Sequence, residues 1–365
     1  MFTISRTRSA PARTLAAVAA GALAVTLAGC SKSETPAAGS TAGNTGPAAS
    51  AATGQAAGPT CGIDTTGYPK VDLKTAIVGF SQSEKEGNPF RIAETQSIKD
   101  EAAKLGIASN HLLTTNAQSD LNKQISDIKS MLAQGAQLLI VAPLNSDGLQ
   151  PALDAAKAKK VPVVTIDRLV TSTPCTDYLT FIGSNFVEQG KRAADAMIKA
   201  TGGTGKVAIL LGASGNNVTT DRTKGFEDQL KISPGLSIVA RQTGEFERAK
   251  GQSVMEQLIQ SNPDITAVYA ENDEMGIGAV TALKSAGKKP GKDVKVVSID
   301  GTRNAVQLIA DGSYNAVIES NPRFGPLAFK ALQDFESGTA VSTKIVISDD
   351  QYDESNAASK VGNAF

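Results

Sequence analysis

Histidine and cysteine are scarce in this chain of 365 residues, which contains one histidine and three cysteines. Because His111 is the only histidine, neither a Ser-His-Asp nor a Cys-His catalytic arrangement can be assembled. No cysteine or histidine has a partner at metal-ligand spacing, so we expect neither a metal nor a cofactor. The stretch GASG at 212–215 matches neither a GxSxG nucleophile elbow nor a GxGxxG dinucleotide loop.

An excess of charge of one sign is also lacking. The chain has 36 basic and 36 acidic residues. This balance gives no electrostatic reason to expect binding to nucleic acid or to an anionic membrane surface.

Residues 1–29 have the pattern of an export signal. Three arginines precede an apolar stretch at 14–28 that is too short to span a membrane comfortably. The sequence LAGC then resembles the lipobox of bacterial lipoproteins, which implies that Cys30 is lipidated and anchors the protein outside the cytoplasm. Loss of the signal would leave 33 basic and 36 acidic residues, a charge of −3.

The next segment, 30–70, is predicted to be a disordered tether. Most of it is Ala, Gly, Ser, Thr and Pro, which bury too little apolar surface to order themselves. At its end, Cys61 is expected either to form a disulfide with Cys175, which an exported protein can keep, or to remain a free thiol.

The remainder alternates strand-like and helix-like patterns. Asn88 and Pro89 have the pattern of a helix start, and Gly106 that of a stop. Continuous apolar strands between helices indicate an α/β fold with parallel sheets covered on both faces. About 290 residues are too many for one such sheet.

We therefore predict two doubly wound α/β lobes joined by a hinge of several strands. The first lobe is expected to comprise 71–184 with 320–345, and the second 185–319 with 346–365. The chain would cross between them near 184–186, 319–321 and 345.

Polar side chains follow several of the predicted strands. Asp167 and Arg168 come directly after VPVVTI, Asn272 follows ITAVYA, and Asp300 ends VKVVSID. Ligands of open parallel sheets bind beyond the carboxyl ends of the strands. Carboxylates accept from hydroxyls and a guanidinium donates to them, so this set suits a neutral polyol. The alternative is that these residues are loop caps and salt bridges.

From Thr75 to about Ile347 the chain resembles the extracytoplasmic sugar-binding proteins of bacterial ABC importers, of the ribose- and galactofuranose-binding type. The motifs that carry this resemblance are Asn88-Pro89-Phe90, Ile166-Asp167-Arg168, the segment 222–226, Gly244-Glu245-Phe246, Asn272-Asp273-Glu274-Met275 and Ile299-Asp300-Gly301. The resemblance implies a two-lobed monomer that binds a monosaccharide and delivers it to a membrane permease.

The same resemblance implies roles for individual residues. Phe90 and Phe246 would stack on the sugar, while its hydroxyls would contact Asp167, Arg168, Arg222, Asn272 and Asp300. Arg91 and Glu319 fit the galactofuranose type, and Ala142 stands where ribose binders have asparagine, so a hexose or furanose is favoured. Asn185 belongs either to the cleft or to the hinge. The alternatives are an exposed Arg91, core roles for the two phenylalanines, and a surface pair of Glu319 with Arg323.

Two other functions remain open. The protein would be a sugar sensor if a membrane receptor rather than a permease read the bound state. A glycosidase would use Asp167 and Asp300 as acid and base, but the sequence does not give their separation. We expect a binding protein and not an enzyme.

Overall fold

The computed structural model describes residues 51–62 and 67–365, all within one compact unit. The export signal and Cys30 lie outside these residues. None of the helices in the described part is long and apolar enough to cross a membrane.

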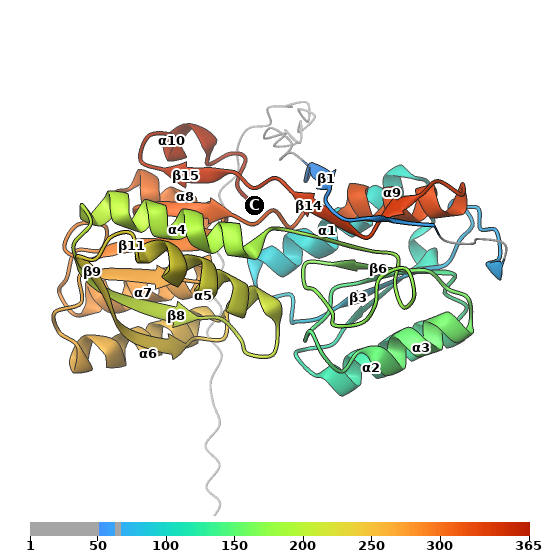
Figure 1. Ribbon diagram of the computed structural model, residues 1–365, viewed down its shortest axis with the longest axis horizontal. Helices are drawn as coiled ribbons and strands as arrows, with labels where there is room; N and C mark the ends of the chain where they lie inside the picture. Colours follow the sequence, from blue (N-terminus) through green and yellow to red (C-terminus); the bar gives the residue numbers. More distant parts are fainter. Residues whose placement is uncertain (1–50, 63–66) are drawn as a thin grey trace, which may run out of the picture. The chain divides into compact units, whose positions relative to one another are not determined.

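Two mostly parallel sheets form two lobes (Figure 1), as the sequence predicts. The first sheet has the order β1 (Gly54–Ala56), β14 (Lys344–Ile347), β7 (Thr180–Gly183), β6 (Val163–Ile166), β5 (Leu138–Val141), β3 (Val78–Gln82) and β4 (Leu112–Asn116). The second has the order β15 (Gln351–Asp353), β12 (Ala316–Glu319), β11 (Lys295–Asp300), β10 (Ala267–Ala270), β8 (Gly205–Leu211) and β9 (Leu236–Thr243). Among the described strands of these two sheets, only the edge strands β1 and β15 pair antiparallel.

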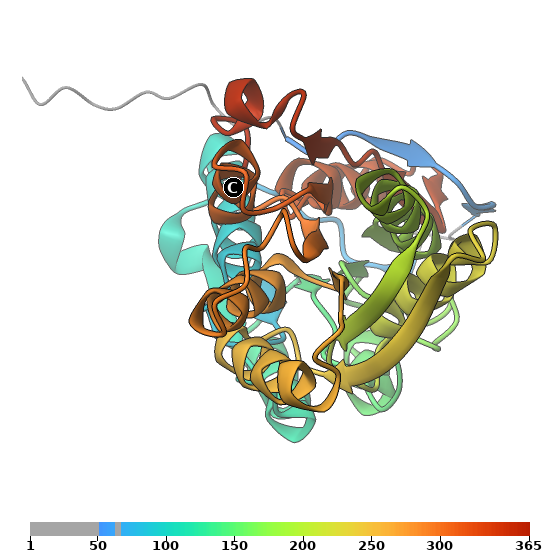
Figure 2. The ribbon, with the colours of Figure 1, turned by 90° about the vertical axis from the view of Figure 1, so that its left-hand side faces the viewer.

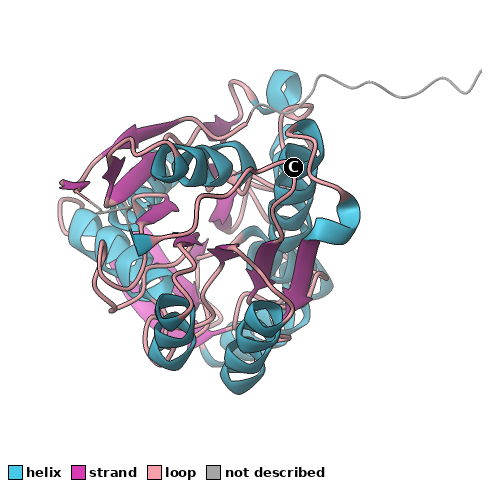
Figure 3. Cartoon of the chain, turned by 90° about the vertical axis from the view of Figure 1, so that its right-hand side faces the viewer, coloured by secondary structure: helices cyan, strands magenta, loops and turns pink. Residues whose placement is uncertain are grey.

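Helices cover both faces of the first sheet (Figure 3), which is why its central strands β7, β6, β5 and β3 are buried throughout and mostly apolar. On one face lie α1 (Pro89–Lys104) and α9 (Gly325–Glu336), and on the other α2 (Leu121–Ala133) and α3 (Gln150–Ala158). Alternate residues of β5 join different hydrophobic clusters, Leu138 and Ile140 on the α1 side and Leu139 and Val141 on the α2 side.

The second sheet is covered in the same way (Figure 2). On one face lie α4 (Phe186–Thr201) and α5 (Asn217–Leu230), and on the other α6 (Arg248–Ser261), α7 (Asp273–Ser285) and α8 (Arg303–Ala310). The short α10 (Ala357–Lys360) packs on α8, and a 3₁₀ turn (Ser109–His111) precedes β4.

Within residues 67–365, the chain passes between the two sheets three times. It crosses after β7 at 184–185, after β12 at 320–324 and after β14 at 348–350. The third crossing lies beyond the predicted position, because β14 continues to Ile347 alongside β7 and so keeps 346–347 in the first lobe.

The prediction of a disordered tether up to residue 70 is wrong for its described part. Gly54–Ala56 forms β1 against β14, and β2 (Thr60–Cys61) pairs with β13 (Val341–Ser342). Small residues fit here because a Cβ on Gly54 would lie only 2.7 Å from the side chain of Ile345. Of the two alternatives for Cys61, the structure contains the disulfide with Cys175, with a Cα–Cα distance of 5.3 Å.

Candidate functional site

The polar strand ends of the two sheets meet around one cavity. It measures about 30 Å³, and its walls come from both lobes. The lining residues are Glu84, Asn88, Phe90, Arg91, Asp167, Arg168, Val218, Arg222, Phe246, Asn272 and Asp300. Eight of the ten predicted ligand contacts are among them.

Local backbone conformation places several of these side chains. Asp167, Phe246 and Asp300 have φ angles of 64°, 63° and 145°. Such conformations cost non-glycine residues about 1–3 kcal/mol each and cluster at functional sites. Asn88 caps α1 by accepting from the Phe90 amide at 2.9 Å, and Pro89 follows at the first helical position, as predicted. This start brings Phe90 and Arg91 to the cavity.

In the first lobe, two arginines and two carboxylates form a continuous ion-pair network. Arg91 donates to Asp167 at 2.7 Å and to Glu84 at 3.1 Å. Arg168 donates to the other oxygen of Glu84 at 2.6 Å and to the Leu144 carbonyl at 2.8 Å. Burial alone would raise the pKa of Glu84, but Arg168 and Arg91 outweigh it and lower this pKa to about 2. Glu84 is therefore ionised and fixes both arginines.

Behind this network lies a buried carboxyl, Glu94 on α1. It accepts from Arg91 at 2.9 Å and from Gln82 at 2.8 Å, while its other oxygen has no protein partner. Burial raises the pKa of Glu94 to about 7, although Arg91 opposes this shift. Glu94 thus holds Nη1 of Arg91, whereas Glu84 holds its Nε.

In the second lobe, Arg222 is the central donor. Its Nη1 donates to the Glu271 carbonyl at 2.5 Å, and its Nη2 lies 3.7 Å from Asp300 Oδ1. Burial raises the pKa of Asp300, against the attraction of Arg222. Asn272 caps α7 through the Met275 amide at 3.0 Å and donates to the Phe246 carbonyl at 3.1 Å. Asn272 thus orients the loop that carries Phe246.

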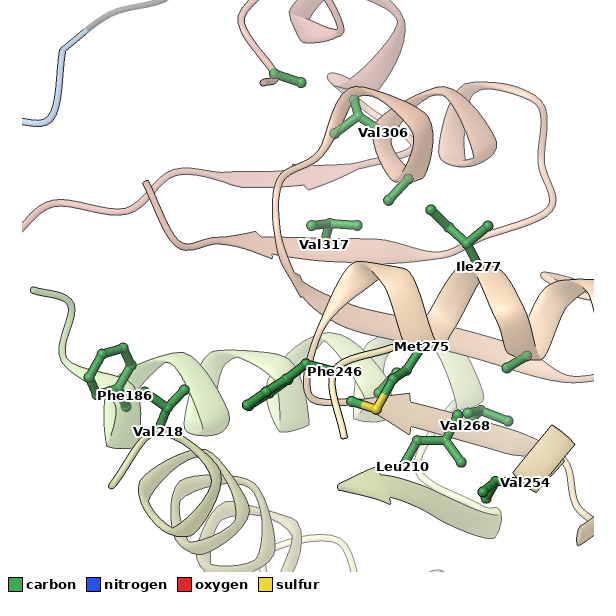
Figure 4. Packing of buried hydrophobic residues seen from close by; sticks show 14 of the residues in the cluster. Phe186, Leu210, Val218, Phe246, Val254, Val268, Met275, Ile277, Val306 and Val317 are labelled. Atoms are coloured by element: carbon green, nitrogen blue, oxygen red, sulfur yellow. The ribbon is translucent and has the colours of Figure 1, made fainter. Parts of the chain in front are cut away.

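The two aromatic side chains sit differently. Phe246 and Val218 belong to the same hydrophobic cluster as Met275 (Figure 4). The Phe90 ring packs edge-on against Phe365, 6.0 Å away between centroids. Both rings are thereby anchored at the wall of the cavity.

A family model described as periplasmic binding protein domain matches residues 78–339. The chain belongs to this family. The galactofuranose-binding protein YtfQ of Escherichia coli is 36% identical over 274 residues, covering 74% of this chain and 85% of the relative. The ribose import binding protein RbsB of Bacillus subtilis is 36% identical over 273 residues, with the same shares.

A solved structure is similarly close. The arabinose ABC transporter's periplasmic binding component from Shewanella sp. ANA-3, bound to α- and β-L-arabinofuranose, superimposes with a TM-score of 0.74 at 36% identity, covering 78% of this chain and 94% of that one. These relatives are binding proteins, which supports the expectation that this periplasmic binding protein is not an enzyme.

Two predicted contacts lie elsewhere in this periplasmic binding protein. Asn185 is an exposed N-cap of α4, and its side chain accepts from the Glu188 amide at 3.1 Å. Glu319 accepts from the Asp350 amide at 2.8 Å and from the Tyr352 hydroxyl at 3.3 Å. Glu319 is thus occupied by Tyr352 of the unforeseen strand β15 and by Asp350 just before that strand. Neither Asn185 nor Glu319 lines the cavity.

Sequence reasoning missed Glu84 as a site residue. It lies two positions after β3, much as Arg168 lies two positions after β6. The strand-end argument therefore applied to it, but the surrounding run SEKEG has the composition of a solvated loop. With Glu84 included, three carboxylates and three guanidinium groups line the cavity, a set suited to an uncharged ligand with many hydroxyls.

Proposed function

We propose that this periplasmic binding protein captures a monosaccharide, a furanose or hexose rather than ribose, in the cavity between its lobes and delivers it to an ABC permease. The observation that carries the proposal is the convergence of eight predicted side chains from both lobes on one cavity. The relatives named for galactofuranose and arabinofuranose support the choice of a furanose.

Binding would exchange the ion-pair contacts within the cavity for contacts to sugar hydroxyls. Asp167 and Asp300 offer acceptors, whereas Arg91, Arg168 and Arg222 offer donors in fixed forks. A neutral sugar leaves the charges of the site balanced, so each ionised group keeps an opposite charge nearby. Phe90 and Phe246 present apolar surface to the C–H faces of the ring.

Closure follows from ligand contacts to both lobes. A sugar held by Asp167 of the first lobe and Arg222 of the second binds a closed arrangement better than an open one, and this difference shifts the population. The three crossings allow bending while each sheet stays intact. Lipidation of Cys30 would keep the protein near the permease, with at least two acyl chains needed for stable retention.

A thermal-shift screen tests the ligand. The chain from Ser31 onward is heated with pentoses, hexoses and furanose-rich sugars, since a ligand that binds only the folded state raises Tm. We expect arabinose or a galactofuranoside to raise Tm more than ribose does. A set of sugars without any effect would refute the proposal. The anchor is tested separately, because full-length Cys30→Ser should leave the membrane fraction, and normal processing and retention would contradict lipidation.

A further inference from the structure

One carboxylate ties the three crossings of the hinge together. Asp349, in the third crossing, accepts through Oδ1 from the Ser184 hydroxyl in the first crossing at 3.2 Å. The same oxygen accepts from the backbone amide of Asn321 in the second crossing, also at 3.2 Å. Bending of the three crossing segments relative to one another is therefore expected to alter the contacts of Asp349.

Gln189 connects this hinge carboxylate to the cavity. The side chain of Gln189 is buried on the first turn of α4, with 1% exposed. Its Nε2 donates to Asp349 Oδ2 at 2.8 Å and to the Glu319 carbonyl at 3.2 Å. Its Oε1 accepts from Arg222 Nε at 2.9 Å. Both polar ends of this amide therefore have partners. The nitrogen bonds to Asp349 and Glu319, and the oxygen bonds to Arg222, which lines the cavity.

The helices that carry Gln189 and Arg222 are locked together. A Cβ on Gly190 of α4 would lie 2.1 Å from the Arg222 carbonyl, and one on Gly225 of α5 would lie 2.0 Å from the Val187 carbonyl. Such close backbone approach leaves α4 and α5 little room to slide. When the hinge bends, the change is expected at the contact of Gln189 with Asp349, because Glu319 ends β12 in the same lobe as α4.

We propose that Gln189 is a positioning residue that couples bending of the hinge to the orientation of Arg222 in the cavity. With its hinge contacts made, the Gln189 amide holds Arg222 Nε, so Nη1 and Nη2 face Glu271 and Asp300. When those contacts change, the amide turns and Arg222 loses its support. The proposal rests on the proposed sugar-binding function for its effect on affinity, but not for the coupling itself.

The first test measures affinity for the sugar found in the screen. Gln189→Met keeps the length of the side chain but removes both hydrogen-bonding ends, and should weaken binding about tenfold, within the usual range of coupling between sites. Gln229→Met is the control, because the half-buried Gln229 also joins α5 to α4, through a solvent-exposed hydrogen bond to Asp195 of 2.6 Å away from the hinge. It should leave the affinity unchanged. Asp349→Asn should weaken binding less in the Gln189→Met background than in wild type.

The second test needs no sugar. The Nε–H resonance of Arg222, assigned by Arg222→Lys, is followed by NMR in the unliganded protein. Asp349 makes no direct contact with Arg222. The substitution Asp349→Asn should nevertheless change the rate at which this proton exchanges with water when it is made in the wild-type protein. The same substitution should leave that rate unchanged when it is made in Gln189→Met. An exchange rate that Asp349→Asn leaves unchanged in the wild-type protein would overturn the coupling. The coupling would also be wrong if Gln189→Met bound the sugar as tightly as wild type and only its Tm were lower. If no sugar binds wild type, the proposed function fails while this test still decides the coupling.

Discussion

The guanidinium carbon of Arg168 lies 5.9 Å from the centre of the Phe246 ring. Arg168 follows β6 of the first lobe, whereas Phe246 lies between β9 and α6 of the second. This cation–π contact therefore joins the lobes at the cavity that both residues line. Asn272 supports it from behind by donating to the Phe246 carbonyl.

Replacing Phe246 by leucine should weaken sugar binding three- to tenfold. Leucine keeps apolar bulk but loses the ring face, and aromatic and cation–π contacts contribute about 0.5–1.5 kcal/mol beyond the buried area. Calorimetric titration gives the change in Kd. Phe226→Leu is the control, since Phe226 stacks on Tyr269 inside the second lobe and away from the cavity. It should lower Tm and leave Kd unchanged, and equal effects of both variants on Kd would contradict the role of Phe246.

Glu84→Gln should change both affinity and acid stability. The folded-state pKa of Glu84 is lowered to about 2, so its stabilising contribution is present above its unfolded-state pKa of about 4.5 and is lost as the pH falls toward 2. Denaturant melts of the unliganded protein give its free energy of unfolding at each pH. Between pH 5 and 2 this free energy should depend less on pH for Glu84→Gln than for wild type. Glu86→Gln, in the same loop but exposed, should behave as wild type.

Asp349→Asn should act in a different pH window and with the opposite sign. Burial raises the pKa of Asp349 to about 6, against hydrogen bonds from Gln189, Asn321 and Ser184. A raised carboxyl pKa favours folding below the unfolded-state value of about 3.8, and this contribution is lost as the pH rises through 6. The free energy of unfolding of wild type, minus that of Asp349→Asn, should therefore fall as the pH rises from about 4 to about 6.5. A flat difference would mean that Asp349 ionises as a surface carboxylate does.

Sequence reasoning succeeded where strand patterning decides position. Asp167 and Asp300 follow apolar runs that are buried strands, and the ends of parallel strands meet at one edge, so their convergence followed from the pattern. It failed where contacts with residues distant in the sequence determine whether a segment is ordered or which partner a side chain has. Glu319 is occupied by β15, and Gly54–Ala56 is ordered by the edge of β14. Neither short strand has a local hydrophobic period, so composition alone could not reveal them.

Residues with two plausible roles mark a second limit. The sequence left Asn185 between the cleft and the hinge, and Asn185 lies in the first crossing, where it caps α4. Asn272 also caps a helix, yet it borders the cavity. Both residues carry the same local helix-start signal, so tertiary packing decides which of them borders the cavity.

Asp167→Asn tests the ligand role of the strand end most directly. Asparagine tolerates the positive φ of 64° at this position and keeps the shape of the side chain, so backbone strain does not enter. The loss of charge leaves Arg91 with Glu84 and Glu94 as ionic partners, and the fold should remain stable within a few degrees of Tm. Affinity should fall at least tenfold, because abandoning a buried charged partner costs about 2–5 kcal/mol.

The opposite pattern would identify Asp167 as a purely structural residue. In that case the main loss would be the ion pair with Arg91 at 2.7 Å, so Tm would fall without ligand while Kd stayed near the wild-type value. Asp177→Asn provides the comparison, since Asp177 also pairs with a basic side chain, Lys157 at 3.5 Å, in the loop that follows β6, but lies outside the cavity. Because the two outcomes move Tm and Kd in opposite combinations, one titration and one melt of each variant decide whether Asp167 contacts the sugar.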